Sequence, residues 1–324
     1  MRATERLEER LRQLPVRIDE AVVRVGPVDV DSYPGRARPH STVTLAGADE
    51  EGRGEHVGWT VQAHAAFAGV ARRLPRGRFT IAEWSAALRP LPAYDRAALE
   101  AAAIDLALHQ QRTSLLELAG AAPAPVRYVV SFARADDPVA EASAMHAGDV
   151  EVKVDADPAW KEATWRRLAS LLRVAVVDFK LGGSAADHER AHRYVPDAWI
   201  EDPAPGGEPW SPGLLARYSA DAGVTCVAAL DALLPRPAAV NVKPARMGGV
   251  LAAVACLARC QVEGIPAYVG GMFEVGVGRG QLLALASIFC PDGPNDIAPL
   301  LHDGPRPPRL LAGQGCGFAE HAPS

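Results

Sequence analysis

The feature that most constrains the fold is a repeated alternation of short apolar segments and helical stretches from about residue 125 onward. Seven segments have the composition of buried strands, and an eighth, near Asp296, is weaker; the seven are 127–132, 150–154, 175–179, 198–200, 224–230, 239–242 and 265–269. Strands that alternate with helices predict a parallel sheet, and eight of them favour a closed (β/α)8 barrel over an open sheet. Such a barrel needs about 200–250 residues, and the chain has 324.

The residues before this repeat have a different pattern. Residues 17–47 alternate polar and apolar side chains, which predicts antiparallel strands, and residues 93–119 form an Ala- and Leu-rich helical stretch that Gly120 can end. The Pro-containing segment 121–125 is a natural hinge. We therefore predict two domains, an α+β domain over residues 1–122 and a modified α/β barrel over residues 123–324.

Composition excludes several classes of protein. Hydrophobic residues make up 48% of the chain, enough for a sizeable core, and the net charge of −5 gives no reason to expect nucleic acid or an anionic membrane as a partner. No segment reaches the ~18 apolar residues of a membrane span, and the charged N-terminus is unlike a signal peptide. The five cysteines form no CxxC pair. We expect a soluble cytoplasmic protein.

Charged residues gather where the predicted strands end. In a parallel barrel these ends meet on one face, and the residues found there are Lys153, Asp155, Asp178, Lys180, Glu201, Asp202, Asp231, Lys243 and Glu274. Each alone is explained as a helix cap or a surface residue. Together they combine carboxylates, which suit a hard cation such as Mg²⁺, with lysines that can serve as general bases. The sequence therefore predicts a metal site with acid/base groups.

Four motifs make this interpretation specific. Residues 241–249, NVKPARMGG, resemble the sixth barrel strand of the mandelate racemase/muconate lactonising branch of the enolase superfamily. Residues 270–279, GGMFEVGVGR, resemble the seventh strand of its o-succinylbenzoate synthases and dipeptide epimerases. Residues 199–203, WIEDP, are similar to its fourth strand, and residues 97–120 to the helix that closes its N-terminal capping domain.

The resemblance implies a site and a reaction. One Mg²⁺ would be held by Asp178, Glu201 and Asp231 on strands three, four and five, with Lys153 and Lys243 as the acid/base pair. The substrate would be a small carboxylate that loses its α-proton to give an enediolate, followed by racemisation, epimerisation or β-elimination of the o-succinylbenzoate synthase kind. The auxiliary candidates are Asp155, Lys180, Asp202 and Glu274. Loops within residues 27–60 would contact the substrate.

The second strand departs from the family's Lys-x-Lys pattern, since it reads Glu151-Val-Lys153-Val-Asp155. Either Lys153 is the second lysine and Glu151 has replaced the first, which we favour, or Lys153 is the first and Asp155 stands in the place of the base. Residues 154–160 also imitate the family's third strand, which would make Asp155 a ligand and shift every assignment.

The fifth strand is a second departure. Only 12 positions separate Asp231 from Lys243, too few for a helix and a strand, whereas 25 separate Lys153 from Asp178. We therefore expect a barrel whose fifth helix is deleted.

Two other functions remain open from the sequence. The barrel could bind a metal and a ligand without the paired-lysine chemistry, or Lys243 could form a Schiff base in an unrelated barrel enzyme. The oligomeric state is open as well, with a homo-oligomer among the alternatives.

Overall fold

The computed structural model describes residues 3–26, 39–144, 150–205, 210–297, 307–312 and 317–318, with side chains described from residue 6. Its N-terminal part holds an antiparallel three-stranded sheet in the order β2-β3-β4 and an antiparallel pair of β1 and β5. The strands are β1 (Pro15–Ile18), β2 (Glu20–Val25), β3 (Ser41–Gly47), β4 (Glu50–His56) and β5 (Gly77–Thr80). The helices are α1 (Ala3–Gln13), α2 (Val61–Ala71), α3 (Ile81–Leu88), α4 (Ala93–Gln111) and α5 (Leu115–Ala119). The antiparallel strands predicted in residues 17–47 are thereby confirmed.

Local sequence explains where the helices of this part begin and end. Thr80 and Ser114 each accept a hydrogen bond from the backbone N–H three residues later, and each forms a capping box with a glutamate. The predicted helix 93–119 is two helices, because Arg112 adopts a left-handed conformation with φ 51° and ends α4. Gly120 ends α5, as predicted, in the same conformation with φ 64°.

Helix α4 lies directly on strand β4 because that strand carries two glycines facing it. A Cβ atom at Gly52 would lie 2.0 Å from the backbone nitrogen of Leu106, and one at Gly54 would lie 2.0 Å from the carbonyl oxygen of Ala98. No side chain fits in either place, so the Ala-rich face of α4 and the Gly-containing strand require each other.

The rest of the chain forms a parallel barrel. Seven parallel strands pair in chain order: β7 (Val129–Phe132), β8 (Glu151–Asp155), β9 (Arg173–Asp178), β10 (Trp199–Glu201), β11 (Tyr218–Ala220), β12 (Ala239–Val242) and β13 (Ala267–Val269). Parallel bridges from Tyr128 to Asn295 and from Gly270 to Asp296 join both edges to one further segment. This short segment takes the place of the weak eighth strand predicted near Asp296. The predicted fold class, an α/β barrel with an N-terminal α+β domain, is confirmed.

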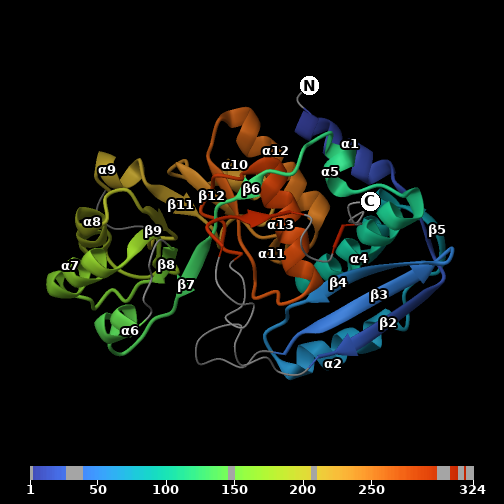
Figure 1. Cartoon of the computed structure of the whole chain (residues 1–324), viewed down its shortest axis with the longest axis horizontal. Helices are drawn as coiled ribbons and strands as arrows, with labels where there is room; N and C mark the ends of the chain where they lie inside the picture. The colour runs from blue at the N-terminus through green and yellow to red at the C-terminus, as the bar shows by residue number, and fades with distance from the viewer. Residues whose placement is uncertain are drawn as a thin grey trace.

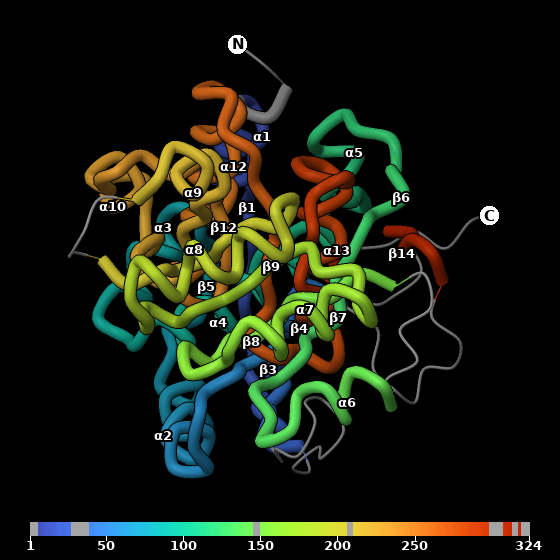
Figure 2. The backbone as a smooth tube through the Cα atoms, turned by 90° about the vertical axis from the view of Figure 1, so that its left-hand side faces the viewer, coloured from blue at the N-terminus to red at the C-terminus, as the bar shows by residue number. Residues whose placement is uncertain are grey.

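Eight helices accompany these strands in the described residues: α6 (Pro138–Ala144), α7 (Glu162–Leu171), α8 (Ala185–Tyr194), α9 (Pro212–Leu215), α10 (Val227–Ala232), α11 (Pro244–Met247), α12 (Val250–Glu263) and α13 (Val277–Phe289). Strands β6 (Pro125–Val126) and β14 (Leu310–Leu311) form a small antiparallel pair. In Figure 1, α6 to α8 with β7 to β9 lie at one end of the molecule, the N-terminal sheet lies at the other, and α12 and α13 lie between them. Figure 2 views the molecule from the α6–α9 end.

The predicted fifth strand, residues 224–230, is wrong. Cys226 accepts a hydrogen bond from the backbone N–H of Ala229 and begins α10, so the apolar run belongs to a short helix. The fifth strand is β11, which comes before that run. The expectation of a deleted fifth helix is corrected too, because the six-residue α10 occupies that place.

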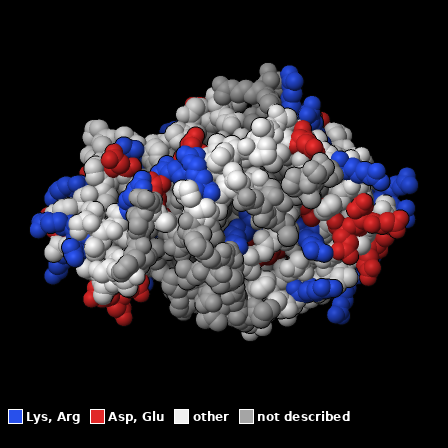
Figure 3. Space-filling model, viewed as in Figure 1, with Lys and Arg blue, Asp and Glu red and all other residues white. Residues whose placement is uncertain are grey.

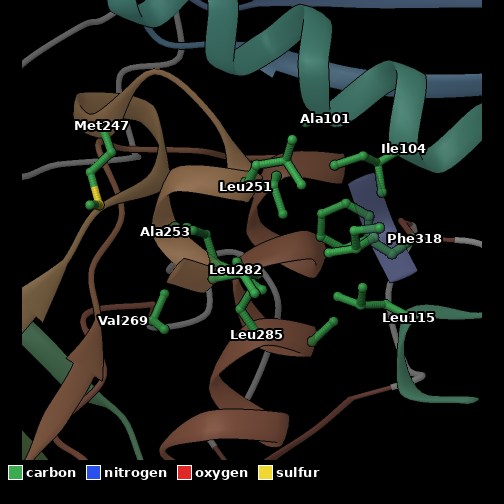
Figure 4. Packing of buried hydrophobic residues seen from close by; sticks show 14 of the residues in the cluster. Ala101, Ile104, Leu115, Met247, Leu251, Ala253, Val269, Leu282, Leu285 and Phe318 are labelled. Atoms are coloured by element: carbon green, nitrogen blue, oxygen red, sulfur yellow. The ribbon is translucent and has the colours of Figure 1, made fainter. Parts of the chain in front are cut away.

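The N-terminal part and the barrel share one hydrophobic core. Side chains of α4, including Ala101 and Ile104, pack against Leu251 of α12 and, through Leu115 and Phe318, approach Leu285 of α13 (Figure 4). All of these side chains are buried. Because apolar burial contributes about 25 cal/mol per Å², a continuous core of this kind fixes α4 against the barrel helices.

Two carboxylates of the N-terminal part also reach the first turns of barrel helices. Glu100, on α4, accepts a hydrogen bond from the backbone N–H of Leu251 at 2.9 Å, and the hydroxyl of Ser85 donates to its other oxygen. Glu55, on β4, makes a similar contact with α13. A carboxylate at a helix N-terminus accepts from N–H groups that have no partner within the helix and meets the positive end of its dipole.

Surface charge and helix length bear on the expectation that neither nucleic acid nor a membrane is a partner. On the face drawn in Figure 3, described acidic side chains gather at the right-hand end with basic side chains beside them, and basic side chains are prominent at the left-hand end. Among the described helices, none combines the length and apolarity that crossing a membrane requires.

Candidate metal centre and lysine cluster

Three buried carboxylates converge at the C-terminal ends of neighbouring barrel strands. Asp178 and Glu201 are the last residues of β9 and β10, and Asp221 directly follows β11. Each of the three offers one oxygen, and these oxygens all lie within 4.8 Å of one another. Glu201 pairs in register with Asp178 on one side and with Ser219 on the other, so the sheet itself sets this spacing.

Two of the predicted ligands belong to this cluster and the third does not. Asp231 lies on α10, where its carboxylate accepts from the Arg259 side chain at 3.1 Å and is 39% exposed. Asp221 stands in the place predicted for Asp231. The spacing of the strand ends points to Asp221 as the ligand, since Glu201, Asp221 and Lys243 follow one another at intervals of 20 and 22 positions. The candidate ligand set is therefore Asp178, Glu201 and Asp221.

Three lysines contact this cluster or its neighbours. The Lys153 ammonium donates to Glu201 and lies 3.2 Å from Asp178. Lys243, directly after β12, donates to Asp221 at 2.9 Å. The sequence contains only four lysines, against thirty arginines. Three of the four therefore meet at one site, in a chain that uses arginine almost everywhere else.

Lys180 is the third lysine, and it links two predicted site residues. Its ammonium lies 2.9 Å from Asp155 and 3.0 Å from Asp178, and its side chain is 53% exposed. Its backbone N–H also donates to Asp178 at 2.8 Å. Asp155 pairs in register with Asp178 across β8 and β9. The structure thus places both auxiliary candidates at the mouth of the site.

Asp202 and Glu274, the other two auxiliary candidates, accept hydrogen bonds from backbone N–H groups. The Asp202 carboxylate accepts from the backbone N–H groups of Asp221 at 2.9 Å and Ala222 at 2.8 Å, which fixes the turn that carries Asp221. Glu274 accepts from the backbone N–H of Met272 at 2.6 Å, two residues away. Both carboxylates thus hold backbone turns at the rim.

The electrostatics show how crowded the carboxylates are. Burial raises the pKa of Glu201 to about 8, and the nearby charges of Asp178 and Asp221 act in the same direction against the opposing effect of Lys153. Burial alone would lower the pKa of Lys153, but Glu201, Asp178 and Asp296 raise it well above its usual value. Burial alone would also raise the pKa values of Asp178 and Asp221, but the charges of Lys153 and Lys243 outweigh it, so both pKa values are instead lowered. Buried acids whose pKa values are perturbed in this way are typical of a functional site.

The donor set fits a hard divalent cation. It consists only of carboxylate oxygens, which Mg²⁺ prefers, and three protein ligands leave coordination positions for water or substrate. Within the part of the chain that the structure describes, no histidine or cysteine joins the cluster. The residues present therefore fit one divalent ion, held by Asp178, Glu201 and Asp221.

Several residues of the site had escaped the sequence interpretation. Tyr268, Asn241 and Ser219 lie on the inner strands, and Arg246 donates to Asp221 from α11. Tyr268, Asn241 and Arg246 lie within a predicted strand or motif, whereas Ser219 lies outside all of them. A polar residue inside a strand of three or four residues gives no periodic signal. Arg246 is part of the sixth-strand motif, where its place next to Lys243 was the available clue.

The N-terminal part contributes to the rim of the site. The Trp59 ring lies edge-on to Phe273 with centroids 6.1 Å apart, and its Nε1 donates to the Tyr94 hydroxyl at 3.2 Å. The Arg246 guanidinium joins this group to the carboxylates, because it donates to both Asp221 and the Met272 sulfur. Of the predicted substrate-contacting region 27–60, residues 27–38 lie outside the described residues.

Solved structures share this architecture over nearly the whole chain. The dipeptide epimerase from Methylococcus capsulatus complexed with Mg ion aligns with a TM-score of 0.77 and 23% identity, covering 94% of this chain and 99% of that one. The dipeptide epimerase from Enterococcus faecalis V583 gives 0.74 and 15%, with coverage of 94% and 99%. Muconate cycloisomerase from Pseudomonas fluorescens gives 0.72 and 18%, with coverage of 94% and 96%. At these identities the alignments establish the fold.

Curated relatives match only a short segment. An N-succinylamino acid racemase from Amycolatopsis sp is 46% identical over 66 residues, which is 20% of this chain and 18% of the racemase. A protein of the same name from Thermus thermophilus is 43% identical over 58 residues, covering 18% and 16%. The match thus spans less than a fifth of each relative's length.

The alignments define the fold class: the structure has the fold seen in muconate cycloisomerase, in the dipeptide epimerases and in a solved protein described as an unknown member of the enolase superfamily. Within that class, the chain belongs to the family described as domain of unknown function DUF8230, whose C-terminal domain matches residues 122–303 and whose N-terminal domain matches residues 9–118.

Proposed function

We propose that this protein is a Mg²⁺-dependent racemase or epimerase that moves the proton on the carbon next to a substrate carboxylate. The observation that carries the proposal is that Lys153 and Lys243 donate to different members of one buried carboxylate cluster, Glu201 and Asp221. Two lysines on separate strands supply what inversion requires, one group to remove the proton and another to return it.

The metal and the lysines have separate tasks in this proposal. A bound Mg²⁺ would supply positive charge beside the substrate carboxylate, stabilising the negative charge that develops as the neighbouring proton leaves. Lys243 is the first candidate for the base, because its ammonium contacts a single carboxylate, whereas Lys153 contacts three. Lys153 then exchanges the proton on the opposite face of the substrate. Lys180, which is half-exposed at the edge of the site, is the alternative candidate for that role.

The proposed substrates are N-acylated amino acids and dipeptides. The short match to N-succinylamino acid racemases and the shared fold with dipeptide epimerases support this class. The rim around Trp59, Phe273 and Tyr94 offers aromatic surface to a substrate side chain. A β-elimination of the o-succinylbenzoate synthase kind uses the same proton abstraction and is distinguished by its product.

Proton exchange in D₂O tests the proposal. The protein is incubated with Mg²⁺ and separate enantiomers of N-acyl amino acids, dipeptides and hydroxy acids, and loss of the α-proton signal is followed by NMR. We expect exchange that requires the metal, and a fall of about 10²–10⁴-fold on replacing a catalytic lysine by alanine.

The four lysines supply matched variants for this experiment. A lysine that serves one face should, when replaced, abolish inversion while leaving exchange of one enantiomer. This result assigns Lys243, Lys153 or Lys180 to its face. Lys161→Ala, an exposed lysine before α7, is the control and should behave as wild type. Cation binding without exchange on any compound would contradict the proposal in favour of a binding protein, and an alkene product would replace it with β-elimination.

A further inference from the structure

A chain of buried hydroxyl groups leads to the central carboxylate of the site. The Tyr268 hydroxyl, on β13, donates to Glu201 Oε2 at 2.5 Å, and the Ser219 hydroxyl, on β11, lies 2.8 Å from the Tyr268 oxygen. Tyr268 has a single hydroxyl proton, which it gives to the carboxylate, so Ser219 must be the donor of the second bond. The order is therefore Ser219 to Tyr268 to Glu201.

This chain crosses the interior of the barrel. Glu201 pairs in register with Ser219, and Asn241 pairs in register with Tyr268, so four neighbouring strands contribute one residue each. All four side chains are almost completely buried. The amide of Asn241 adds a second donor to Glu201 Oε2 at 3.1 Å.

The two oxygens of Glu201 are thus used differently. Oε2 receives the hydroxyl of Tyr268 and the amide of Asn241, both fixed on strands, while Oε1 receives only the flexible ammonium of Lys153. Hydrogen bonds from fixed outer residues orient a carboxylate ligand and select the oxygen that it offers to a metal.

We infer that Tyr268 is a positioning residue for the metal centre, which holds Glu201 so that Oε1 alone faces the divalent cation, with Ser219 orienting the Tyr268 hydroxyl. The inference rests on the cation of the proposed function, but not on the substrate or the reaction. Its effect is therefore measurable in the absence of any substrate.

The test is the affinity for Mn²⁺, measured by electron paramagnetic resonance of the free ion and confirmed by competition with Mg²⁺. Tyr268→Phe removes one oxygen and keeps the ring in the core, and we expect the affinity to fall about tenfold or more, as for other outer partners of metal ligands. Tyr194→Phe is the matched control, because its hydroxyl contacts Glu162 at 3.2 Å between the outer helices α7 and α8, and it should keep wild-type affinity.

A double-mutant cycle separates positioning from general loosening of the barrel. Ser219→Ala should weaken Mn²⁺ binding in the same direction but less, and adding it to Tyr268→Phe should cost nothing further, because Ser219 acts only through the hydroxyl. Independent, additive losses would overturn the inference. So would wild-type Mn²⁺ affinity in Tyr268→Phe, which leaves the proposed function intact, whereas a wild-type protein that binds no Mn²⁺ would overturn both.

Discussion

The carboxylate of Glu55 accepts a hydrogen bond from the backbone N–H of Gly276 at 2.9 Å, joining β4 to the start of α13. It also accepts from the backbone N–H groups of Val275 at 2.7 Å and Gly278 at 3.1 Å. Since α13 follows the loop that carries Met272 and Phe273, this contact ties the N-terminal part to the rim of the site. The N-cap residue of α13, Gly276, has no side chain, so Glu55, which lies 221 positions earlier in the chain, caps this helix.

Replacing this carboxylate should destabilise the protein. Glu55→Ala leaves three N–H groups of a buried helix start without their acceptor, and we expect the free energy of unfolding to fall by about 2–3 kcal/mol. Urea denaturation followed by circular dichroism measures it. Glu51→Ala, at an exposed position of the same strand, should change stability by less than about 0.5 kcal/mol. Similar losses in both variants would contradict the capping role.

The revised ligand set makes a direct prediction about cation binding. Asp221→Asn removes one of three charged ligands, so Mn²⁺ affinity should fall by more than the 10–100-fold typical of an outer partner. Asp231→Asn, which alters a half-exposed ion pair with Arg259, should leave that affinity unchanged. Isothermal titration calorimetry decides between them. A larger loss of Mn²⁺ affinity in Asp231→Asn than in Asp221→Asn would instead identify Asp231 as the ligand.

The error over Asp231 shows where pattern alone fails. Strand β11 is only Tyr-Ser-Ala, and its buried Ser219 is accommodated because it hydrogen bonds to Tyr268 on another strand. Nothing in residues 218–220 distinguishes them from a loop. The apolar run at 224–230 has the composition of a strand, but its burial comes from a short helix packed on α12. Three-residue strands are specified by barrel neighbours, which a single sequence does not reveal.

Other parts of the site were predictable from local sequence. Asp178, Glu201 and Lys243 each follow an apolar run with strand composition, and the barrel brings such ends to one face whatever the loops do. The pairing of Lys180 with Asp155 was not foreseen, because it depends on the register of β8 against β9. The sequence thus predicted the residues that follow strong strands, and the structure supplied the contacts between them.

Gly270 should be essential for the position of Lys243. A Cβ atom at this residue would lie 2.3 Å from Asn241 Oδ1 and 2.6 Å from Lys243 Cε, so Gly270→Ala must displace one or both side chains. Because a displacement of about 1 Å can cost 10²-fold in rate, we expect α-proton exchange to fall by about that factor. The NMR exchange assay measures it.

The control for this substitution is a glycine with open space. Gly69, in α2, has only the tip of Arg73 within 4 Å of an added Cβ. Gly69→Ala should keep full exchange activity and raise helix stability by about 0.5–1 kcal/mol. Wild-type exchange in Gly270→Ala would show that the position of Lys243 does not depend on the space beside Gly270.

Asn295 should be among the most sensitive positions for stability. Its side-chain amide is directed at the carbonyl oxygens of Arg127, Cys290 and Gly293, each at 2.9 Å, and its Oδ1 accepts from the Val269 backbone at 2.8 Å. These bonds connect both edges of the seven-stranded sheet through the short segment that takes the place of an eighth strand. Asn295→Ala should lower the free energy of unfolding by about 3–5 kcal/mol.

Chemical denaturation measures this loss, and a nearby exposed residue is its control. Asp292, whose side chain is 81% exposed, pairs with Arg309 at 2.8 Å. Asp292→Ala should cost less than about 1 kcal/mol, as for other surface ion pairs. If Asn295→Ala were equally mild, the side chain would not be what closes the barrel.

The buried Glu100 predicts a pH dependence of stability. Burial raises its pKa above 4.5, against the opposing effects of Ser85 and the Leu251 backbone. The folded state then holds this proton more tightly than the unfolded state, so its contribution is complete below pH 4.5 and is lost as pH rises through the folded pKa. Glu100→Gln keeps an acceptor for Leu251 and removes the titration. The melting temperature of Glu100→Gln relative to wild type should therefore increase from pH 4.5 upward.

Glu83 supplies the control of opposite sign. Its backbone and side-chain hydrogen bonds with Thr80 lower its pKa below 4.5, so its stabilisation is present above that pH and is lost as the pH falls. Glu83→Gln should accordingly be most destabilised relative to wild type near neutral pH and least in acid. Thermal unfolding of wild type and both variants across this range gives two differences with opposite slopes. Parallel slopes would mean that the pKa of Glu100 is not raised in the folded state, and that its hydrogen bonds at the start of α12 outweigh the effect of burial.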